Sequence, residues 1–287
     1  MQIIHTVDEM WDYARSARSS GATFGCVPTM GALHDGHASL IRAAAADHAH
    51  VVTSIFVNPT QFGPNEDFER YPRTLDRDVE IVAANGGTAV FAPSVDTMYP
   101  QGSSTMIHVG GVTAPFEGLV RPGHFDGVAT VVCKLFQAMQ PDEAYFGQKD
   151  YQQTLVIRQL ARDLLLPVRI TVCPTLREVN GLAMSSRNIY LSEQERHNAA
   201  AIFRALRTGQ ALAHVGETRR DAFAEVMRGD LGTMLGTSID YLEAARADDL
   251  STPERFAAGE QIVLLAAVRM GTTRLIDNLL ARIGGEI

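Results

Sequence analysis

Residues 23–37 read TFGCVPTMGALHDGH, and this stretch decides the predicted fold. Its first part, Thr23–Val27, is an apolar run typical of a buried strand. A glycine-containing loop follows, and the alanine-rich run Ala38–Ala49 then predicts a helix. A strand, a loop and a helix in this order form the first half of a βαβ unit, in which helices connect parallel strands.

The same alternation continues through the first two thirds of the chain. Val51–Val57 (VVTSIFV) is the clearest strand, because it is β-branched and aromatic and is followed by an Asn-Pro pair. The other predicted strands are Thr88–Phe91, Glu143–Phe146 and Val168–Val172, and the helices are Thr74–Asn85, Asp126–Met139 and Asp150–Leu164. The pattern predicts a Rossmann-like α/β domain with a mostly parallel sheet, in which ligands bind beyond the carboxyl ends of the strands.

The pattern changes after Cys173. A polar loop, Arg177–Asn188, precedes helical sequence from Ser192 to Met234, and two extended runs follow, Ile239–Ala244 and Gln261–Val268. We therefore expect a smaller α+β domain at the C-terminus. The predicted domains are residues 1–184 and 185–287, with a hinge near Arg187.

Composition excludes several classes of protein. The 287 residues carry 25 Lys and Arg against 33 Asp and Glu, a net charge of −8, which argues against a nucleic-acid partner. The longest uncharged apolar stretch, Ile262–Val268, is far shorter than a membrane span, so no membrane partner is expected. Asp8 and Glu9 stand where a signal peptide would need a basic patch.

Three cysteines, Cys26, Cys133 and Cys173, are far apart in the sequence and form no CxxC pair. A disulfide framework or a zinc site is not expected from this spacing, and a reducing compartment fits it. We therefore predict a cytoplasmic protein.

Two histidines stand where the first of these helices is predicted to begin. The spacing of His34 and His37 places their rings close together, and Gly36 leaves room for a flat or anionic ligand. A helix N-terminus adds N–H donors and partial positive charge, which suit a phosphate. The HxGH pattern after a strand also resembles the nucleotide-binding signature of adenylyl-transferring enzymes. The alternative is a surface loop with two solvated histidines.

Neutral amides follow the clearest strand. Asn58 and Gln61 can both donate and accept hydrogen bonds, and such groups select a hydroxylated or carboxylated small molecule. Turn formation is the alternative for Asn58, because Asn-Pro pairs often begin a turn.

Two later loops carry positive charge. Lys149 lies between a predicted strand and a predicted helix, where an ammonium group suits a phosphate, and Asp150 is a plausible helix N-cap. In the second loop, Ser185 and Ser186 precede Arg187, a combination that can bind a polyphosphate. The alternatives are a solvated lysine and a serine-rich interdomain linker.

The segment 116–125 (FEGLVRPGHF) mixes Glu, Arg and His in a Gly- and Pro-containing stretch too long for a simple turn. We interpret it as a loop that covers the site.

Taken together, these motifs resemble the pantoate–β-alanine ligase (pantothenate synthetase) family. The resemblance rests on five collinear blocks, PTMGALHDGH, FVNPTQFGPNEDFERYPRT, RPGHFDGVATVV, FGQKDYQQ and GLAMSSRN, which span residues 28 to 188. The Met-Ser-Ser-Arg stretch is also similar to the KMSKS loop that accompanies HxGH. Two positions depart from the family pattern: Gln148 stands where Glu is frequent, and Leu176 stands where Val is frequent.

The resemblance implies a set of site residues. His37, His34, Lys149 and Arg187 are the implied catalytic residues, with His37 as the acid. The implied ATP-binding residues are Met30, Gly31, Ala32, Leu33, His34, Asp35, Gly36, His37, Gly147, Gln148, Lys149, Asp150, Leu176, Met184, Ser185, Ser186 and Arg187. Gln61 and Gln153 would hold pantoate, and Asn58 completes the predicted substrate-binding set. Asp78 would be linked to Mg²⁺, although its companion position here is Arg77, and a solvated helix carboxylate is the alternative.

The resemblance also implies the reaction. The family joins D-pantoate to β-alanine using ATP and Mg²⁺, through a pantoyl-adenylate, and releases AMP and pyrophosphate. It forms homodimers through the N-terminal domain, and the smaller domain closes over the site. Two other functions remain open: a nucleotidylyltransferase acting on a phosphate ester, which would need more Arg or Lys around the substrate, and a non-catalytic nucleotide sensor.

Overall fold

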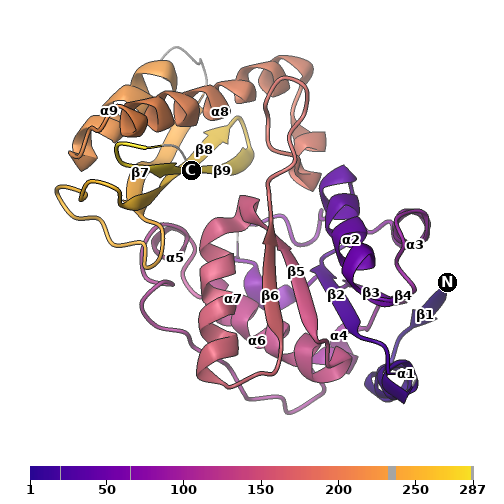
Figure 1. Ribbon diagram of the computed structural model, residues 1–287. Helices are drawn as coiled ribbons and strands as arrows, with labels where there is room; N and C mark the ends of the chain where they lie inside the picture. The colour runs from indigo at the N-terminus through magenta and orange to yellow at the C-terminus, as the bar shows by residue number, and fades with distance from the viewer. Residues whose placement is uncertain (20, 65, 232–236, 286–287) are drawn as a thin grey trace. The chain divides into compact units, whose positions relative to one another are not determined.

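The computed structural model describes residues 1–19, 21–64, 66–231 and 237–285, and it divides into two compact units (Figure 1). Unit 1 comprises residues 1–148 and 152–174, and unit 2 comprises residues 149–151 and 175–287. The division after residue 174 precedes the predicted boundary at 184/185. The short segment 149–151 belongs to unit 2 although residues of unit 1 flank it on both sides in the sequence.

Unit 1 contains a six-stranded sheet in the order β1-β4-β3-β2-β5-β6, and every strand pair in it is parallel. The strands are β1 (Gln2–Ile4), β2 (Phe24–Thr29), β3 (His50–Ile55), β4 (Ala89–Phe91), β5 (Glu143–Gly147) and β6 (Arg169–Cys173). The parallel α/β prediction is confirmed. Strand β1 was missed, because three residues give too short a pattern to recognise.

Helices cover both faces of this sheet. On one face, α1 (Val7–Ser19), α6 (His124–Met139) and α7 (Tyr151–Asp163) bury Met10, Phe136 and Leu160 against the strands. On the other face, α2 (Asp35–Asp47) and α3 (Leu75–Ala84) bury Ile41 and Val82. The shorter elements of unit 1 are η1 (Pro59–Gln61), α4 (Val95–Met98), α5 (Glu117–Val120) and η2, whose first residue is Gln148 and whose last is Asp150.

The strand order reverses at β2. From β2 the chain proceeds outward to β3 and β4 on one side, whereas β5 pairs with the other side of β2. Ligands of open α/β sheets bind beyond the carboxyl ends of the strands at such a reversal. The predicted HxGH loop leaves the carboxyl end of β2, and Gly147 is the last residue of β5. The topology therefore places both where a ligand is expected.

Unit 2 contains an antiparallel three-stranded sheet, β7-β8-β9, with α8 and α9 packed on it (Figure 1). Its elements are η3 (Ser186–Tyr190), α8 (Glu193–His214), α9 (Arg220–Leu231), β7 (Thr237–Arg246), β8 (Gln261–Met270) and β9 (Thr273–Arg282). The α+β prediction is confirmed, whereas β9 and α1 were not foreseen. The predicted helical sequence ran to Met234, and residues 232–234 lie outside the described residues.

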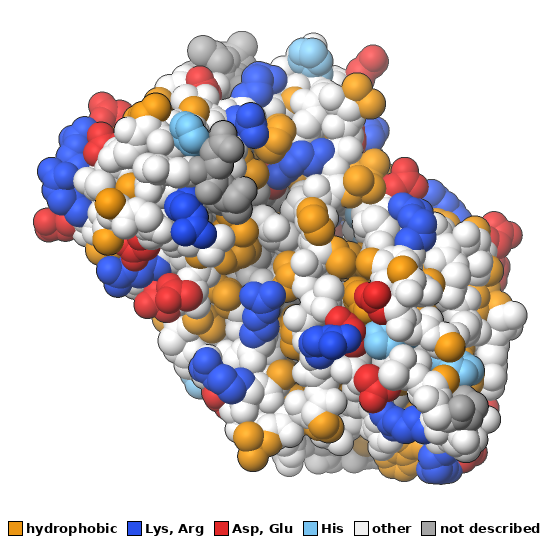
Figure 2. All heavy atoms as spheres, viewed as in Figure 1, with side chains coloured by type: hydrophobic (Ala, Val, Ile, Leu, Met, Phe, Trp, Pro, Cys, Tyr) orange, Lys and Arg blue, Asp and Glu red, His pale blue; other side chains and the backbone are white. Residues whose placement is uncertain are grey.

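On the face drawn in Figure 2, blue Lys and Arg side chains stand singly or in small groups among red acidic ones. In the described part of the chain, no helix is long and apolar enough to cross a bilayer.

Candidate functional site

The two predicted histidines meet at the start of α2. His34 is the N-cap residue: the Gly36 N–H donates to its Nδ1 at 3.1 Å, and the His34 N–H donates to Nδ1 of His37 at 3.4 Å. The ring centroids are 4.2 Å apart. Because each Nδ1 accepts a backbone N–H, each neutral ring carries its proton on Nε2. The HxGH spacing is thus a reciprocal helix cap that makes both Nε2 atoms donors, and the expected closeness of the rings is confirmed.

The loop before these histidines is held by Asp78. Gly31 and Ala32 both have positive φ, +84° and +51°. The Ala32 N–H donates to Oδ2 of Asp78 at 2.9 Å, the Leu33 N–H donates to Oδ1 at 2.8 Å, and the Thr74 hydroxyl donates to Oδ1 at 3.2 Å. Successive N–H groups in such a conformation form an anion-binding concavity, and here the anion is a side chain of the protein itself.

This geometry corrects both interpretations of Asp78. Its side chain is fully buried, so it is not a solvated helix carboxylate. Both oxygens accept bonds from the loop or from Thr74, the N-cap residue of α3, whereas Mg²⁺ requires carboxylate oxygens turned toward the ion and its waters. Asp78 therefore does not fit as a metal ligand. Within the described residues there is also no group of three or more His, Cys, Asp or Glu that could hold a metal ion.

Asn58 stabilises the turn in which it lies. It is the N-cap of η1, and its Oδ1 accepts bonds from the Thr60 N–H at 3.4 Å and from the Tyr99 hydroxyl at 2.8 Å. Its Nδ2 donates to Oε1 of Gln61 at 3.1 Å and to the Gly127 carbonyl at 3.2 Å. The structure therefore supports the alternative turn role of Asn58, and its contact with Gln61 makes it a positioning residue.

The contact with Asn58 fixes the amide of Gln61. Because Oε1 accepts from Asn58, Nε2 is the atom on the other side, where it lies 3.1 Å from Sδ of Met30. A thioether sulfur is a weak acceptor. A carboxylate reaching this position would accept a much stronger hydrogen bond from Gln61 than Met30 does.

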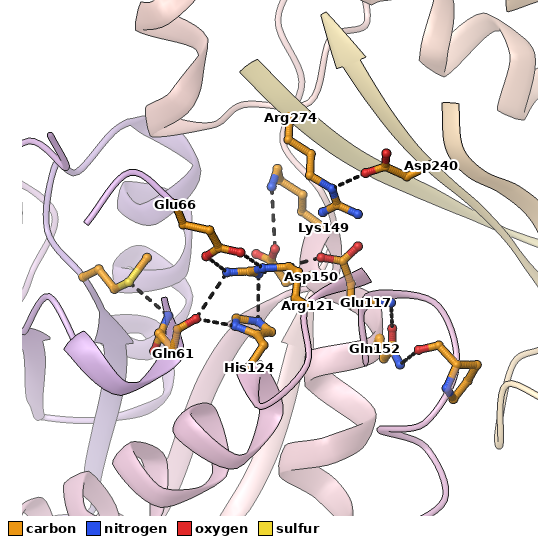
Figure 3. A network of polar contacts seen from close by, with 12 residues as sticks. Gln61, Glu66, Glu117, Arg121, His124, Lys149, Asp150, Gln152, Asp240 and Arg274 are labelled. Carbon is orange, nitrogen blue, oxygen red and sulfur yellow. Dashed lines mark hydrogen bonds and ion pairs between the residues drawn. The ribbon is translucent and has the colours of Figure 1, made fainter. Parts of the chain in front are cut away.

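The main chain at Gln61 is held by the segment interpreted as a covering loop (Figure 3). Arg121 donates through Nη2 to the Gln61 carbonyl at 3.3 Å, and its Nε and Nη2 contact Glu66 at 2.6 Å each. Nδ1 of His124 lies 2.8 Å from the same carbonyl, and Glu117 is 3.7 Å from Arg121. The segment 116–125 thus supports η1 and the loop that follows it.

His124 is neutral in this network. Burial, together with the neighbouring Arg121 guanidinium, lowers the pKa of His124 to about 4. Arg121 lies 3.0 Å from Nε2 of His124 and can donate only, so Nε2 accepts and Nδ1 donates to Gln61.

Gln152 was not among the predicted site residues, and it supports the main chain before and at the start of α5. Its Nε2 donates to the carbonyls of Val112 and Pro115 at 2.9 and 2.7 Å, and its Oε1 accepts the Glu117 N–H at 3.1 Å. The predicted residue, Gln153, is its half-buried neighbour on α7. Helical periodicity could have separated them, because Gln152 shares the buried face of α7 with Leu155.

In unit 2, Lys149 lies 3.6 Å from the Asp150 carboxylate, and the Lys149 carbonyl accepts a bond from the Asn278 side chain at 2.8 Å. Asp150 directly precedes α7 in the sequence, where the N-cap was predicted. No sequence pattern links Asn278 to a site 129 residues earlier.

The serine-containing loop lies within unit 2 and is held by hydrogen bonds, so it is not a linker between the two units. The Met184 N–H donates to the Leu176 carbonyl at 3.0 Å, and Arg177 pairs with Ala183 in a β-bridge. Ser185 is the N-cap of η3 and accepts the Arg187 N–H at 3.3 Å.

The predicted site residues are therefore divided between the units. Unit 1 holds Met30, Gly31, Ala32, Leu33, His34, Asp35, Gly36, His37, Asn58, Gln61, Asp78, Gly147, Gln148 and Gln153. Unit 2 holds Lys149, Asp150, Leu176, Met184, Ser185, Ser186 and Arg187.

Comparisons with known proteins agree over almost the whole chain. A model of the pantoate–β-alanine ligase family matches residues 2–280. The pantothenate synthetase of Roseiflexus sp. (strain RS-1) is 53% identical over 97% of this chain and 98% of that protein. The crystal structure of pantothenate synthetase from Thermus thermophilus matches with a TM-score of 0.89 at 43% identity, covering 97% and 99% of the two chains. Pantoate–β-alanine ligase from Francisella tularensis, in complex with beta-gamma ATP and β-alanine, matches with a TM-score of 0.79 at 35% identity, covering 98% and 97%.

Proposed function

This chain belongs to the pantoate–β-alanine ligase family, and on that premise we propose that it condenses D-pantoate with β-alanine through a pantoyl-adenylate, converting ATP to AMP and pyrophosphate. The observation that carries the proposal lies within unit 1. Two imidazoles with Nε2 donors cap the helix after β2, and the Gln61 amide follows the neighbouring strand β3 with its Nε2 directed away from Asn58. The first pair suits a phosphate and the amide suits a carboxylate.

In the first half-reaction, a carboxylate oxygen of pantoate attacks the α-phosphorus of ATP, and the bond from that phosphorus to the bridging oxygen breaks. Negative charge builds up on the transferred phosphate and on the departing pyrophosphate, so positioning and donor groups supply most of the catalysis. We assign this role to His34 and His37 in unit 1 and to Lys149 and Arg187 in unit 2. Gln61 and Gln153 would orient the pantoate.

In the second half-reaction, the neutral amine of β-alanine attacks the acyl carbon of the adenylate. The C–N bond forms, the acyl carbon–oxygen bond to AMP breaks, and the amine loses a proton. His37 is our candidate for the acid of the reaction: its Nε2–H is a donor that can hydrogen-bond a departing phosphate oxygen, and the proton of the amine passes to solvent.

The nucleotide would contact the rest of the predicted set. In unit 1 these are the loop 30–37, Gly147 and Gln148, and in unit 2 they are Asp150, Leu176 and the loop 184–187. The Francisella tularensis relative was crystallised with ATP and β-alanine ligands, which supports both substrates.

Three features of this proposal stay predictions. Mg²⁺ would be bound to phosphate oxygens and water, and no side chain of this chain is assigned to it. Homodimer formation through unit 1 and a cytoplasmic location are the others.

Pantoate-dependent exchange of labelled pyrophosphate into ATP tests the adenylate step without β-alanine. We expect exchange that requires pantoate, and exchange is absent if the chain does not form an adenylate. Adding β-alanine should then yield AMP and pantothenate in equal amounts. A phosphate-ester substrate that replaces pantoate in the exchange would support the other nucleotidylyltransferase function instead.

We expect His37→Ala and Lys149→Ala each to lower the exchange rate at least roughly a hundredfold, since removal of one aligned donor costs about 2.7–4 kcal/mol of barrier. The matched control is His214→Ala, which removes an exposed imidazole at the end of α8. Circular dichroism checks that all three variants fold. Near wild-type exchange in both site variants would show that the site is misassigned.

A further inference from the structure

We propose that Asn278 and Tyr151 are positioning residues that attach Lys149 to unit 2. This inference rests on the proposed function only for the role of Lys149 in nucleotide binding; the attachment itself is a property of unit 2. Asn278 lies outside the five motifs, and Tyr151 lies within FGQKDYQQ but is not among the predicted site residues.

The first attachment is from β9 to the Lys149 main chain. Asn278 is 1% exposed, and its Nδ2 donates to the Lys149 carbonyl at 2.8 Å. An exposed asparagine could rotate away, but a buried amide that loses this partner would leave a donor unsatisfied. The bond therefore fixes where the Lys149 peptide lies relative to β9.

The donor itself is rigidly supported. The Arg177 guanidinium contacts both carboxylate oxygens of Asp277, at 2.6 and 3.0 Å, and donates to the Asn278 carbonyl at 3.3 Å. It also stacks 3.9 Å from the centroid of the Phe203 ring. Asp277 and Asn278 are thus held by a bidentate ion pair against helix α8, which gives Asn278 little freedom to follow an unattached lysine.

The second attachment is two residues further along. The Tyr151 hydroxyl donates to the Ala247 carbonyl at 2.6 Å, at the residue that follows β7. The three-residue segment 149–151 is therefore held at both ends by unit 2, whereas β5 before it and the part of α7 from Gln152 onward belong to unit 1.

The Lys149 ammonium group belongs to this attached segment. The Lys149 side chain is 21% exposed, and its Nζ lies 3.6 Å from Oδ1 of Asp150 in the same segment. Figure 3 shows Lys149 and Asp150 facing each other. Arg187 also belongs to unit 2, so both cations proposed for the phosphates lie in that unit, whereas the two histidines lie in unit 1. Loosening Asn278 or Tyr151 should misplace Lys149 without altering the histidines.

Lysine chemistry offers a direct test, because Lys134 and Lys149 are the only two lysines in the sequence. An amine-reactive acylating reagent, followed by peptide mass spectrometry, gives the modification rate of each. We expect Asn278→Ala and Tyr151→Phe to raise the Lys149 rate by more than about twofold while the Lys134 rate stays constant as an internal standard. The matched control is Gln210→Ala, which removes an amide donor to the Leu280 carbonyl of the same strand, a bond that is also 2.8 Å long.

Nucleotide binding completes the test as a double-mutant cycle. We expect Asn278→Ala to weaken ATP binding, measured by calorimetry, roughly tenfold, since small displacements of a positioned group can cost up to about a hundredfold. In a Lys149→Ala background the same substitution should change the affinity by less than about twofold. Tyr151→Phe, which keeps the ring, provides the same cycle if Asn278→Ala does not fold.

Two results overturn the inference: unchanged Lys149 labelling in both variants, or equal loss of ATP affinity with and without Lys149. The second result would mean that Asn278 acts only on the fold. The proposed function fails separately, if the wild-type protein binds ATP but catalyses no pantoate-dependent exchange; the labelling rates then still decide whether unit 2 holds Lys149.

Discussion

At the scale of single residues, Asn58 and Asp78 orient hydrogen-bonding groups of other residues instead of offering their own groups to a ligand. Asn58 holds Oε1 of the Gln61 amide, so that Nε2 faces Met30, and Asp78 holds two N–H groups of the loop before α2. A site whose donors are already oriented does not lose free energy in orienting them when the substrate binds. Substitution of a residue that contacts the substrate should therefore change the KM, whereas substitution of a residue that orients others should change the free energy of unfolding.

Gln61→Glu keeps the size of the side chain but replaces the Nε2 donor with an oxygen. We expect the KM for pantoate to rise roughly tenfold to a hundredfold, because a hydrogen bond to a charged group is lost and like charges meet. The matched control is Gln159→Glu, the same change on the outer part of α7. Steady-state kinetics check this, and an unchanged KM would exclude Gln61 from the pantoate site.

Asp78→Asn should destabilise the protein by about 1–3 kcal/mol, because an amide NH₂ would face a backbone N–H that now donates to a carboxylate. Asp76→Asn is the control, since Asp76 is an exposed acid in the same first turn of α3. Urea unfolding without Mg²⁺ measures the effect. If Asp78 bound the metal instead, Asp78→Asn would leave this free energy unchanged and raise the Mg²⁺ concentration needed for exchange.

At the scale of elements, α6 packs directly on η1, and Gly127 makes this possible. A Cβ at position 127 would lie 2.3 Å from the Thr60 carbonyl oxygen. The same glycine carbonyl accepts a bond from Asn58. Close approach of α6 therefore helps to set the position of Gln61, the last residue of η1.

Gly127→Ala should force these two elements apart. We expect a loss of about 1–3 kcal/mol in the free energy of unfolding from overpacking, together with a higher KM for pantoate. Gly229→Ala in α9 is the control, because a Cβ there meets nothing within 4 Å. In a helix that exchange should stabilise by roughly 0.5–1 kcal/mol. Equal effects of the two substitutions on urea unfolding would contradict the packing argument.

At the scale of the whole molecule, two buried polar networks make stability depend on pH in different ranges. His124 lies beside the site with its pKa lowered to about 4 by burial and by Arg121. Glu143, at the start of β5, has its pKa lowered to about 2, chiefly by its hydrogen bond from Arg169. A depressed pKa stabilises the fold above the unfolded value and ceases to do so as the pH falls through the folded value.

We therefore expect the free energy of unfolding to fall between pH 6.5 and 4 as unfolded, but not folded, chains protonate residue 124. The contribution is on the order of 2–3 kcal/mol over that range, and the part due to Glu143 is lost only between pH 4.5 and 2. His124→Asn should flatten the first range alone. Urea unfolding at a series of pH values checks this, with the exposed His214→Asn as control; an unaltered slope in His124→Asn would contradict it.

The sequence by itself determined the class of fold and the motifs. The alternation of strands and helices can be read from short stretches of sequence, and β-branched runs that end at Asn-Pro or Gly can be recognised without knowing which strands they pair with. The parallel sheet and the loops that leave it were therefore predictable. The HxGH spacing likewise brought His34 and His37 together within one helical turn. The five collinear blocks pointed to the family.

Only the tertiary structure decided what depends on contacts between distant segments. Strand β9 carries Asp277 and Asn278 in its middle, which interrupt the apolar run, and it is a strand because it pairs with β8 and is held by Arg177. The roles of Asp78 and Asn58 turned on burial and on which atoms their oxygens and nitrogens reach. Lys149 is attached to β9 by the side-chain amide of Asn278, which is 129 residues away in the sequence. A sequence pattern reflects only residues that are close together in the chain, so it could not reveal this contact.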